Sequence, residues 1–390
     1  MKSNIKIIFP DFLLNERNNI RNTNVYLTAS PITDTLEINT VTFTFNSDRV
    51  MSYFSDGKAF NIWFNNLNIG RFYITGIDQV ADGVYTVSGE DLKGALDKEQ
   101  YAGGIFERVT FSSLVADILG EREHYIETPL RNVMLSGYLP ICSKREALRQ
   151  ACFAAGACVD TSFRDDIKFF VPKEQPRGYV TPYRTLEGLK VSQTQPISTI
   201  NLTEHKYIKP SDSRLEELYN GYLISGTYTV TFKKAMYGLS CVGATIIDSG
   251  ANYATIKLSI PSDVIITGYA YDNVKKINVR SIPNTSGINP NTVDISNATL
   301  ISADNSNIVL DNLSGFYNKA STISERFIMT SERPLDAVNV FTPLYGMKTG
   351  RIISLDINFS STMVATANIL IEKDYTDSVF CDEVFTGEWY

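Results

Sequence analysis

The sequence has little histidine and tryptophan. Two residues of each type stand among 390, against 21 tyrosines and 21 phenylalanines. Catalysis by a histidine base would therefore have to use His124 or His205. Each lies in a charged stretch with no nucleophile motif beside it, so a surface position is expected for both.

Cysteine is also scarce, and its pattern argues against a common kind of metal site. The five cysteines are odd in number, and no two have the C-x-x-C spacing that zinc sites favour. Buried free thiols are therefore expected, and no metal site is predicted. The cysteines are Cys142, Cys152, Cys158, Cys241 and Cys381.

Long apolar runs and an excess of positive charge are missing too. No stretch reaches about 18 apolar residues, and the apolar part of residues 1–19 is too short, and too soon followed by charge, for a secretory signal. We expect a soluble chain, made in the cytoplasm and not inserted into a membrane. The net charge of −7 and the pI near 5.1 argue against a protein that wraps nucleic acid through a basic surface.

The residues that are abundant are typical of strands. Aromatic, β-branched and amide side chains suit strands that are separated by Asn, Gly, Ser and Asp turns. A length of 390 residues corresponds to two to four domains. We expect a mainly β protein with a small α/β module and four domains in all.

Residues 1–105 are the first expected domain. TVTFTF at 40–45 and RFYITGI at 71–77 mix β-branched and aromatic residues. NNLN at 65–68 and ADG at 81–83 supply the residues that hairpins need for positive φ. A meander or small barrel is the expected result.

Residues 106–185 are predicted to form the α/β module. Apolar residues recur at helical spacing over 111–119. Ser143 and Glu146 form a capping box in front of a second apolar stripe, which predicts a capped helix. Two short strands are expected after that helix.

The remainder is predicted as a loop-rich β domain over 186–330 and a closing β domain over 331–390. Strand signals return, as in TYTVTF at 227–232 and VIITGYAY at 264–271. Residues 281–312 are rich in Asn, Ser and Pro, which indicates long loops or an irregular β-insertion.

Cys142 is the best candidate for a catalytic nucleophile. It stands directly before the helix start at Ser143, where a thiolate can be activated, and His205 would be its partner. The alternative is that Cys142 ends an apolar segment and packs under the helix. That alternative is the one we expect.

Two pairs of adjacent acids are the next candidates. A glycosidase needs two carboxylates roughly 5 to 10 Å apart across a cleft, whereas neighbouring acids in a polar loop are expected to be solvated. The pairs are Glu216 with Glu217 and Asp165 with Asp166.

Glycines and aromatics complete the candidates. Gly103 and Gly104 lack the G-x-G-x-x-G and P-loop patterns that cradle phosphates, so they are expected to turn the chain between domains. Exposed strand aromatics could stack on sugars, but a core or interface role is expected instead. We predict no catalytic, cofactor-binding or metal site. The aromatics are Trp63, beside Asn65 and Asn66, and Tyr269 with Tyr271.

Three stretches point to one family. They are SGEDLKGALDKEQYAGGIF at 88–106, LSGYLPICSKREALRQACFAAGACVDTS at 135–162 and TPLYGMKTGRIISLDINFSSTMVATANI at 342–369. Together they resemble the tail-hub or baseplate proteins of bacteriophages and of phage-derived contractile particles of Gram-positive hosts. The second stretch follows the family's strand, capped helix and strand. The matching positions include Asp91, Gly94, Asp97, Gly103 and Gly104 in the first stretch, Pro140, Arg145, Glu146, Gly156 and Asp160 in the second, and Tyr345, Gly346, Lys348, Gly350 and Asp356 in the third.

The resemblance covers most of the chain and implies a structural role without enzymatic activity. It implies two barrel-like domains per subunit, with the α/β and looped β domains outside them. Three subunits would form a pseudo-hexameric ring, a symmetry adaptor that joins the sixfold tail tube to the trimeric central spike or tail tip. The implied partners are further copies of the chain, the tube and spike proteins, other baseplate proteins and a tape-measure protein. DNA would only pass through the lumen, and the location would be the baseplate of a virion or contractile injection system.

Two other functions stay open. Aromatic and Asn-rich loops are compatible with a receptor- or glycan-binding tail tip protein. A peptidoglycan hydrolase would use Cys142 with His205, or one of the acid pairs. Host-cell binding and zymography separate these functions from the structural one.

Overall fold

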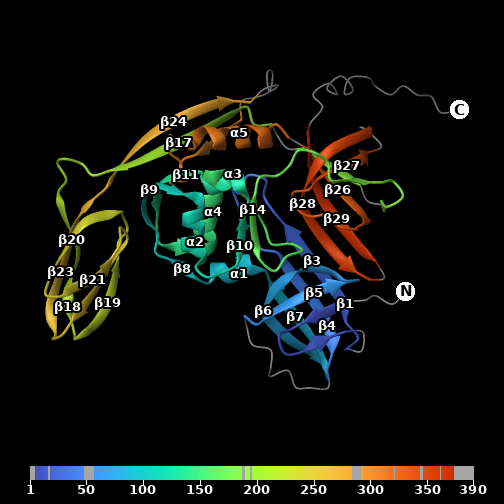
Figure 1. The fold of residues 1–390 in the computed structure, drawn as a ribbon, viewed down its shortest axis with the longest axis horizontal. Helices are drawn as coiled ribbons and strands as arrows, with labels where there is room; N and C mark the ends of the chain where they lie inside the picture. The colour runs from blue at the N-terminus through green and yellow to red at the C-terminus, as the bar shows by residue number, and fades with distance from the viewer. Residues whose placement is uncertain are drawn as a thin grey trace.

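Strand pairing builds most of the computed structural model, which describes residues 5–15, 18–47, 57–186, 189–193, 196–282, 291–319, 321–342, 346–360 and 362–372. One sheet of 13 strands carries two barrel-like regions, and smaller sheets form the rest. Figure 1 shows the barrels on one side, the α/β module in the middle and a β arm at the far side. The expected class, mainly β with a small α/β module, is confirmed. Cys381 and Tyr345 lie outside the described residues.

The first barrel is built by the first seven strands. Alternate residues of these strands are buried, as the period of two requires, and Phe43, Phe60 and Phe72 fill the interior. Asn65 and Asn66 have positive φ at a hairpin tip, as the sequence predicted. The strands are β1 (Ile5–Ile8), β2 (Leu13–Leu14), β3 (Arg21–Thr28), β4 (Thr40–Asn46), β5 (Ala59–Phe64), β6 (Leu67–Ala81) and β7 (Val84–Glu90).

The second barrel continues the same sheet. Strand β28 pairs antiparallel with β3, so that Leu355 lies opposite Leu27, and a single hydrophobic core runs through both barrels. Ala365 and Ala367 lie on the buried face of β29 in this second barrel. The strands are β15 (Gly178–Val180), β16 (Lys190–Gln193), β26 (Ser321–Ile328), β27 (Ala337–Thr342), β28 (Gly346–Phe359) and β29 (Met363–Ile371).

The α/β module has its own hydrophobic core around two helices. Both predicted helices are confirmed, as α2 (Phe111–Leu119) and α4 (Lys144–Ala155), and Cys152 is buried on α4. The two strands predicted after α4 are also confirmed and pair antiparallel. The other elements are α1 (Leu92–Asp97), β8 (Gln100–Tyr101), β9 (Gly104–Thr110), β10 (His124–Ile126), α3 (Thr128–Arg131), β11 (Met134–Leu139), β12 (Cys142–Ser143), β13 (Cys158–Asp160) and β14 (Ile167–Phe170).

A two-stranded ribbon carries the arm away from the module (Figure 1). It consists of β17 (Thr199–Ile208) and β24 (Asp272–Ser281), which pair along their whole length, and β25 (Thr292–Ile295) adds a parallel edge. The arm is a sandwich of two three-stranded sheets around a separate small core. Its strands are β18 (Leu215–Leu223), β19 (Gly226–Thr231), β20 (Met236–Val242), β21 (Thr245–Ser249), β22 (Tyr253–Leu258) and β23 (Ser262–Ala270).

The strand pairings group the chain differently from the four expected segments. Strand β26 was placed in the loop-rich domain and β15 in the module, yet both pair within the second barrel. The physical reason is that residues after 331 supply too few strands to close a barrel. The second barrel therefore takes strands from earlier in the chain.

The Asn- and Ser-rich region 281–312 is not all loop. The expectation of long loops or an irregular β-insertion is confirmed in part by strand β25 (Thr292–Ile295). It is wrong from Ser306 onward, where helix α5 (Ser306–Tyr317) begins. Val309, Leu310 and Leu313 recur at helical spacing and pack into the core of the module. Burial of this stripe outweighs the weak helix propensity of the Asn and Ser residues. Residues 283–290 of the region lie outside the described part of the chain.

Candidate functional site

The structure does not bring the proposed nucleophile and base together. Cys142 is half-buried against the core of the module, and burial and the nearby Glu146 carboxylate raise the pKa of its thiol to about 11. A thiol of this kind stays protonated at neutral pH, which is the opposite of activation. No hydrogen bond joins Cys142 to His205 in the described part of the chain.

Both histidine side chains form hydrogen bonds within the protein. His205 is only 3% exposed on the ribbon, so the expected surface position is wrong for this residue. Its Nδ1 accepts a hydrogen bond from Nδ2 of Asn273 at 2.9 Å, and burial lowers its pKa. His124 is half-buried at the start of β10, with Nδ1 2.8 Å from the carbonyl oxygen of Arg122.

The acid pairs do not line a common cleft. Glu216 forms an ion pair with Lys234 at 3.2 Å, whereas Glu217 accepts a hydrogen bond from Asn220. Asp165 accepts hydrogen bonds from two asparagine side chains of the first barrel, and Asp166 forms an ion pair with Arg164 at 2.8 Å. Each carboxylate thus has a separate ion-pair or hydrogen-bond partner.

The glycine and aromatic candidates have packing roles. Gly103 has φ +64, and a Cβ there would run into the carbonyl oxygen of Leu139, which accounts for glycine at this turn. Tyr237 packs against Tyr269 and Tyr271, with ring centroids 5.6 and 4.9 Å apart. Half-buried Trp63 precedes the hairpin tip of the first barrel.

The described residues offer neither a cluster of metal ligands nor a helix that could span a membrane. Among the described residues, no group of three or more His, Cys, Asp or Glu side chains could hold a metal ion. The described helices include none that is long and apolar enough to cross a membrane.

Two of the resemblance stretches meet inside the module, where the end of α1 contacts the start of α4. Asp97, at the end of α1, accepts hydrogen bonds from Ser143 and from Arg145, both at 2.9 Å. Arg145 also donates to the carbonyl oxygen of Leu36 at 3.0 Å. The Arg145 guanidinium is the main cause of a lowered pKa for the Asp97 carboxyl. The first and second stretches thus contact each other through these hydrogen bonds.

A second polar cluster lies between the first barrel and the module. Asp91 and Lys93 are each 1% exposed and form an ion pair at 3.4 Å. Asp91 caps α1 and also accepts a hydrogen bond from the hydroxyl of Thr161. Asn39 donates to Thr161 as well, so that strand ends of the first barrel are tied to the module. Such a network fixes the two parts in one arrangement.

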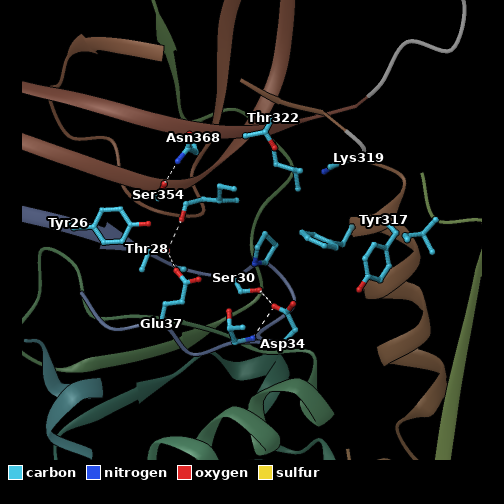
Figure 2. A pocket seen from close by; sticks show the side chains of 17 residues that line it. Tyr26, Thr28, Ser30, Asp34, Glu37, Tyr317, Lys319, Thr322, Ser354 and Asn368 are labelled. Atoms are coloured by element: carbon cyan, nitrogen blue, oxygen red, sulfur yellow. Dashed lines mark hydrogen bonds between the residues drawn. The ribbon is translucent and has the colours of Figure 1, made fainter. Parts of the chain in front are cut away.

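A cavity lies where the barrels meet the module. This junction pocket has a volume of about 510 Å³. Strands β3, β28 and β29, the loop at 29–37 and the end of α5 contribute side chains to it. Figure 2 shows Tyr26 and Tyr317 on opposite sides, with Asp34 and Glu37 below and Asn368 above.

Hydrogen bonds within the wall hold the polar groups of the junction pocket. Asp34 accepts from the hydroxyl of Ser30 at 2.6 Å, and Glu37 accepts from the hydroxyl of Thr28 at 2.6 Å. Asn368 donates through Nδ2 to Ser354 at 2.8 Å. The predictions from sequence missed this pocket, because its residues come from separate segments with no common motif.

Three solved structures of tail proteins, two of them from prophages, share this fold over nearly their whole length. A tail protein from Neisseria meningitidis MC58 has a TM-score of 0.59 at 9% identity, covering 96% of this chain and 97% of its own. The 43 kDa tail protein of prophage MuSo2 from Shewanella oneidensis has a TM-score of 0.55 at 7% identity, with coverage of 95% and 98%. Prophage tail protein gp18 from Listeria monocytogenes EGD-e has 0.53 at 9%, with 94% of each chain covered. No protein-family model matches this chain, and no curated protein sequence does.

At identities of 7 to 9%, this likeness is one of fold. The chain has the fold of phage tail proteins over nearly its whole length. The resemblance that the three sequence stretches indicated is therefore confirmed at the level of fold.

Proposed function

We propose that the chain is a structural tail hub protein that forms a homotrimeric ring. The observation that carries the proposal is the pairing of β3 with β28, which fixes two barrels side by side in one subunit. Three such subunits would present six barrels, the number needed to match a sixfold tube. Short terminal strands such as β2 and β16 pair on one side only among the described strands, and neighbouring subunits would cover such edges.

In this proposal the ring joins the tail tube to the trimeric central spike or tail tip. The module and the arm would lie outside the ring, where other baseplate proteins contact it. The net charge of −7 supports a lumen that repels the DNA backbone, so that DNA and a tape-measure protein pass without adhering. The location would be the baseplate of a virion or phage-like particle, and the role would not be enzymatic.

The mass of the purified protein tests the proposal. Native mass spectrometry should find a species three times the mass of the 43.5 kDa chain. Electron microscopy of that species should show a ring with six similar lobes around a channel. A monomer at every concentration, or a dimer, would contradict the trimeric ring.

A peptidoglycan hydrolase is the alternative that has the least support. The raised pKa of Cys142 and the separate partners of the acid pairs both disfavour it. Zymography with the wild type and Cys142→Ala separates the two functions. Lysis by the wild type and its loss in the variant would establish an enzyme.

A further inference from the structure

The junction pocket has the size and construction of a small-molecule site. Its volume of about 510 Å³ lies inside the range of roughly 300 to 1,000 Å³ that is usual for ligand pockets. Both barrels and the end of α5 contribute to its walls, so the cavity is part of the packing between rigid elements. Binding there does not depend on the proposed ring.

Aromatic rings form two of its walls. Tyr26 lies on one side and Tyr317 on the other (Figure 2). Phe316 also lines the pocket. The rings of Phe316 and Tyr317 pack edge to face, with centroids 5.1 Å apart. Aromatic faces supply rigid apolar area next to polar tips, which suits a ligand that has an apolar face and a polar rim.

The polar groups of the junction pocket keep unused hydrogen-bonding capacity. The bonds within the wall involve only Oδ1 of Asp34, Oε2 of Glu37 and the Nδ2 group of Asn368. Within the described part of the chain, Oδ2 of Asp34, Oε1 of Glu37 and Oδ1 of Asn368 have no hydrogen-bond partner. Burial and the charge of Asp34 raise the pKa of Tyr317, so its hydroxyl stays a donor at neutral pH. The pocket thus offers acceptors and donors together.

The charge of the pocket restricts the ligand further. Two carboxylates face one ammonium group, Lys319, which already has Glu174 as a partner at 3.5 Å. A phosphate, sulfate or acidic sugar would meet net repulsion there. A small cation would leave the aromatic walls and the donor groups without a role. A neutral ligand with several hydroxyl groups can both pack on the aromatic walls and form hydrogen bonds with the polar groups.

We propose that the junction pocket binds a neutral carbohydrate of one or two rings. The C–H face of a sugar ring would pack on Tyr26 or on Phe316, and its hydroxyls would donate to Asp34, Glu37 and Asn368. A free sugar and the end of a longer glycan share this chemistry. The size of the pocket limits recognition to terminal rings in either case.

The test uses the full chain and isothermal titration with maltose, diacetylchitobiose, glucuronate and arginine methyl ester. At least one of the two neutral sugars should bind, and Asp34→Ala/Glu37→Ala should weaken that binding at least about tenfold. Both acids are exposed, so the double variant is expected to fold, and its melting temperature checks this. Asp82→Ala/Glu121→Ala removes the same charge at exposed sites outside the pocket and should change nothing.

Three results would overturn the proposal. They are no heat of binding with either neutral sugar, equal weakening by the two double variants, and preferential binding of glucuronate or of arginine methyl ester. Amylose and maltose compared at an equal concentration of chain ends separate the two sources of the ligand, because the end of a longer glycan would then compete as well as maltose, whereas a site for a free sugar alone would reject it. The mass measurement for the ring reports a different property, so the two proposals fail independently.

Discussion

At the scale of single residues, Glu325 is a carboxylic acid in apolar surroundings. It is 3% exposed on β26, on the same face as Ile323 and Phe327, and lies opposite Ala367 on the neighbouring strand. The small alanines leave room for its carboxyl group. In the described part of the chain its Oε2 is buried without a hydrogen-bond partner, and burial raises its pKa to about 7.

This raised pKa predicts a loss of stability as the pH rises. The folded state holds the proton between the ordinary value of 4.5 and about 7, whereas the unfolded state releases it. The free energy of unfolding therefore falls through this window, by about 3 kcal/mol in total. Glu325→Gln removes the charge and should raise the free energy of unfolding by about that amount at pH 8, with little effect near pH 4.5. Urea unfolding at both pH values measures the difference.

The exposed Glu217 on β18 provides the control for this prediction. Glu217→Gln removes the same charge at a solvated position and should leave the pH dependence of unfolding as in the wild type. If Glu325→Gln also gave the wild-type profile, the Glu325 carboxyl would have to be charged and solvated in the folded protein.

At the scale of elements, the start of helix α4 is the best-defined local feature. The hydroxyl of Ser143 accepts from the backbone N–H of Glu146 at 3.2 Å and donates to Asp97. Ser143→Ala therefore removes a cap and a contact between elements, and should cost about 2 kcal/mol in the free energy of unfolding. Thr110→Ala is the matched control, since Thr110 caps α2 without a bond to another element, and should cost about 1 kcal/mol. Equal losses in chemical denaturation would show that the bond to Asp97 contributes nothing.

The same helix shows how far local sequence predicts structure. Ser143 caps α4 as predicted, and Gly156 ends it with φ +65. The reciprocal half of the capping box is absent, because the Glu146 carboxylate binds Arg149 and Gln150 instead of the N-cap backbone. Local patterns identified the helix and its ends, whereas the choice of partner for Glu146 depends on neighbours within the folded helix.

Helix α5 and the junction pocket could not be predicted in this way. The apolar stripe of α5 is short and lies among Asn and Ser residues that favour turns, so only its burial against the module makes it a helix. The pocket combines Tyr26 and Asp34 with Tyr317 and Asn368, which lie hundreds of residues further along the chain. Tyr26 and Asn368 converge through the pairing of β28 with both β3 and β29, and Tyr317 arrives with α5. No pattern of period two or 3.6 encodes a pairing between strands as far apart as β3 and β28.

At the scale of the whole molecule, the parts differ in how firmly they are joined. The two barrels share one core, and the Asp91–Lys93 cluster ties the first barrel to the module. The arm has a separate core and is connected through the ribbon, in which Ile208 lies opposite Asp272. Asn252 adds an anchor from the arm to the module, with Nδ2 2.7 Å from the carbonyl oxygen of Ala102 and 2.9 Å from that of Leu139.

This arrangement predicts that the arm can be removed without unfolding the rest. Replacing residues 209–271 by Asn-Gly joins Ile208 to Asp272 through a two-residue hairpin turn that suits their pairing. The shortened chain should lose about 2 kcal/mol in the protection of α4 against hydrogen exchange, the worth of the two hydrogen bonds of Asn252. Asn252→Ala in the full chain removes the same bonds and should reproduce that loss. A much larger loss in the shortened chain than in Asn252→Ala would mean that the arm and the module fold as one unit, since the anchor alone could not account for it.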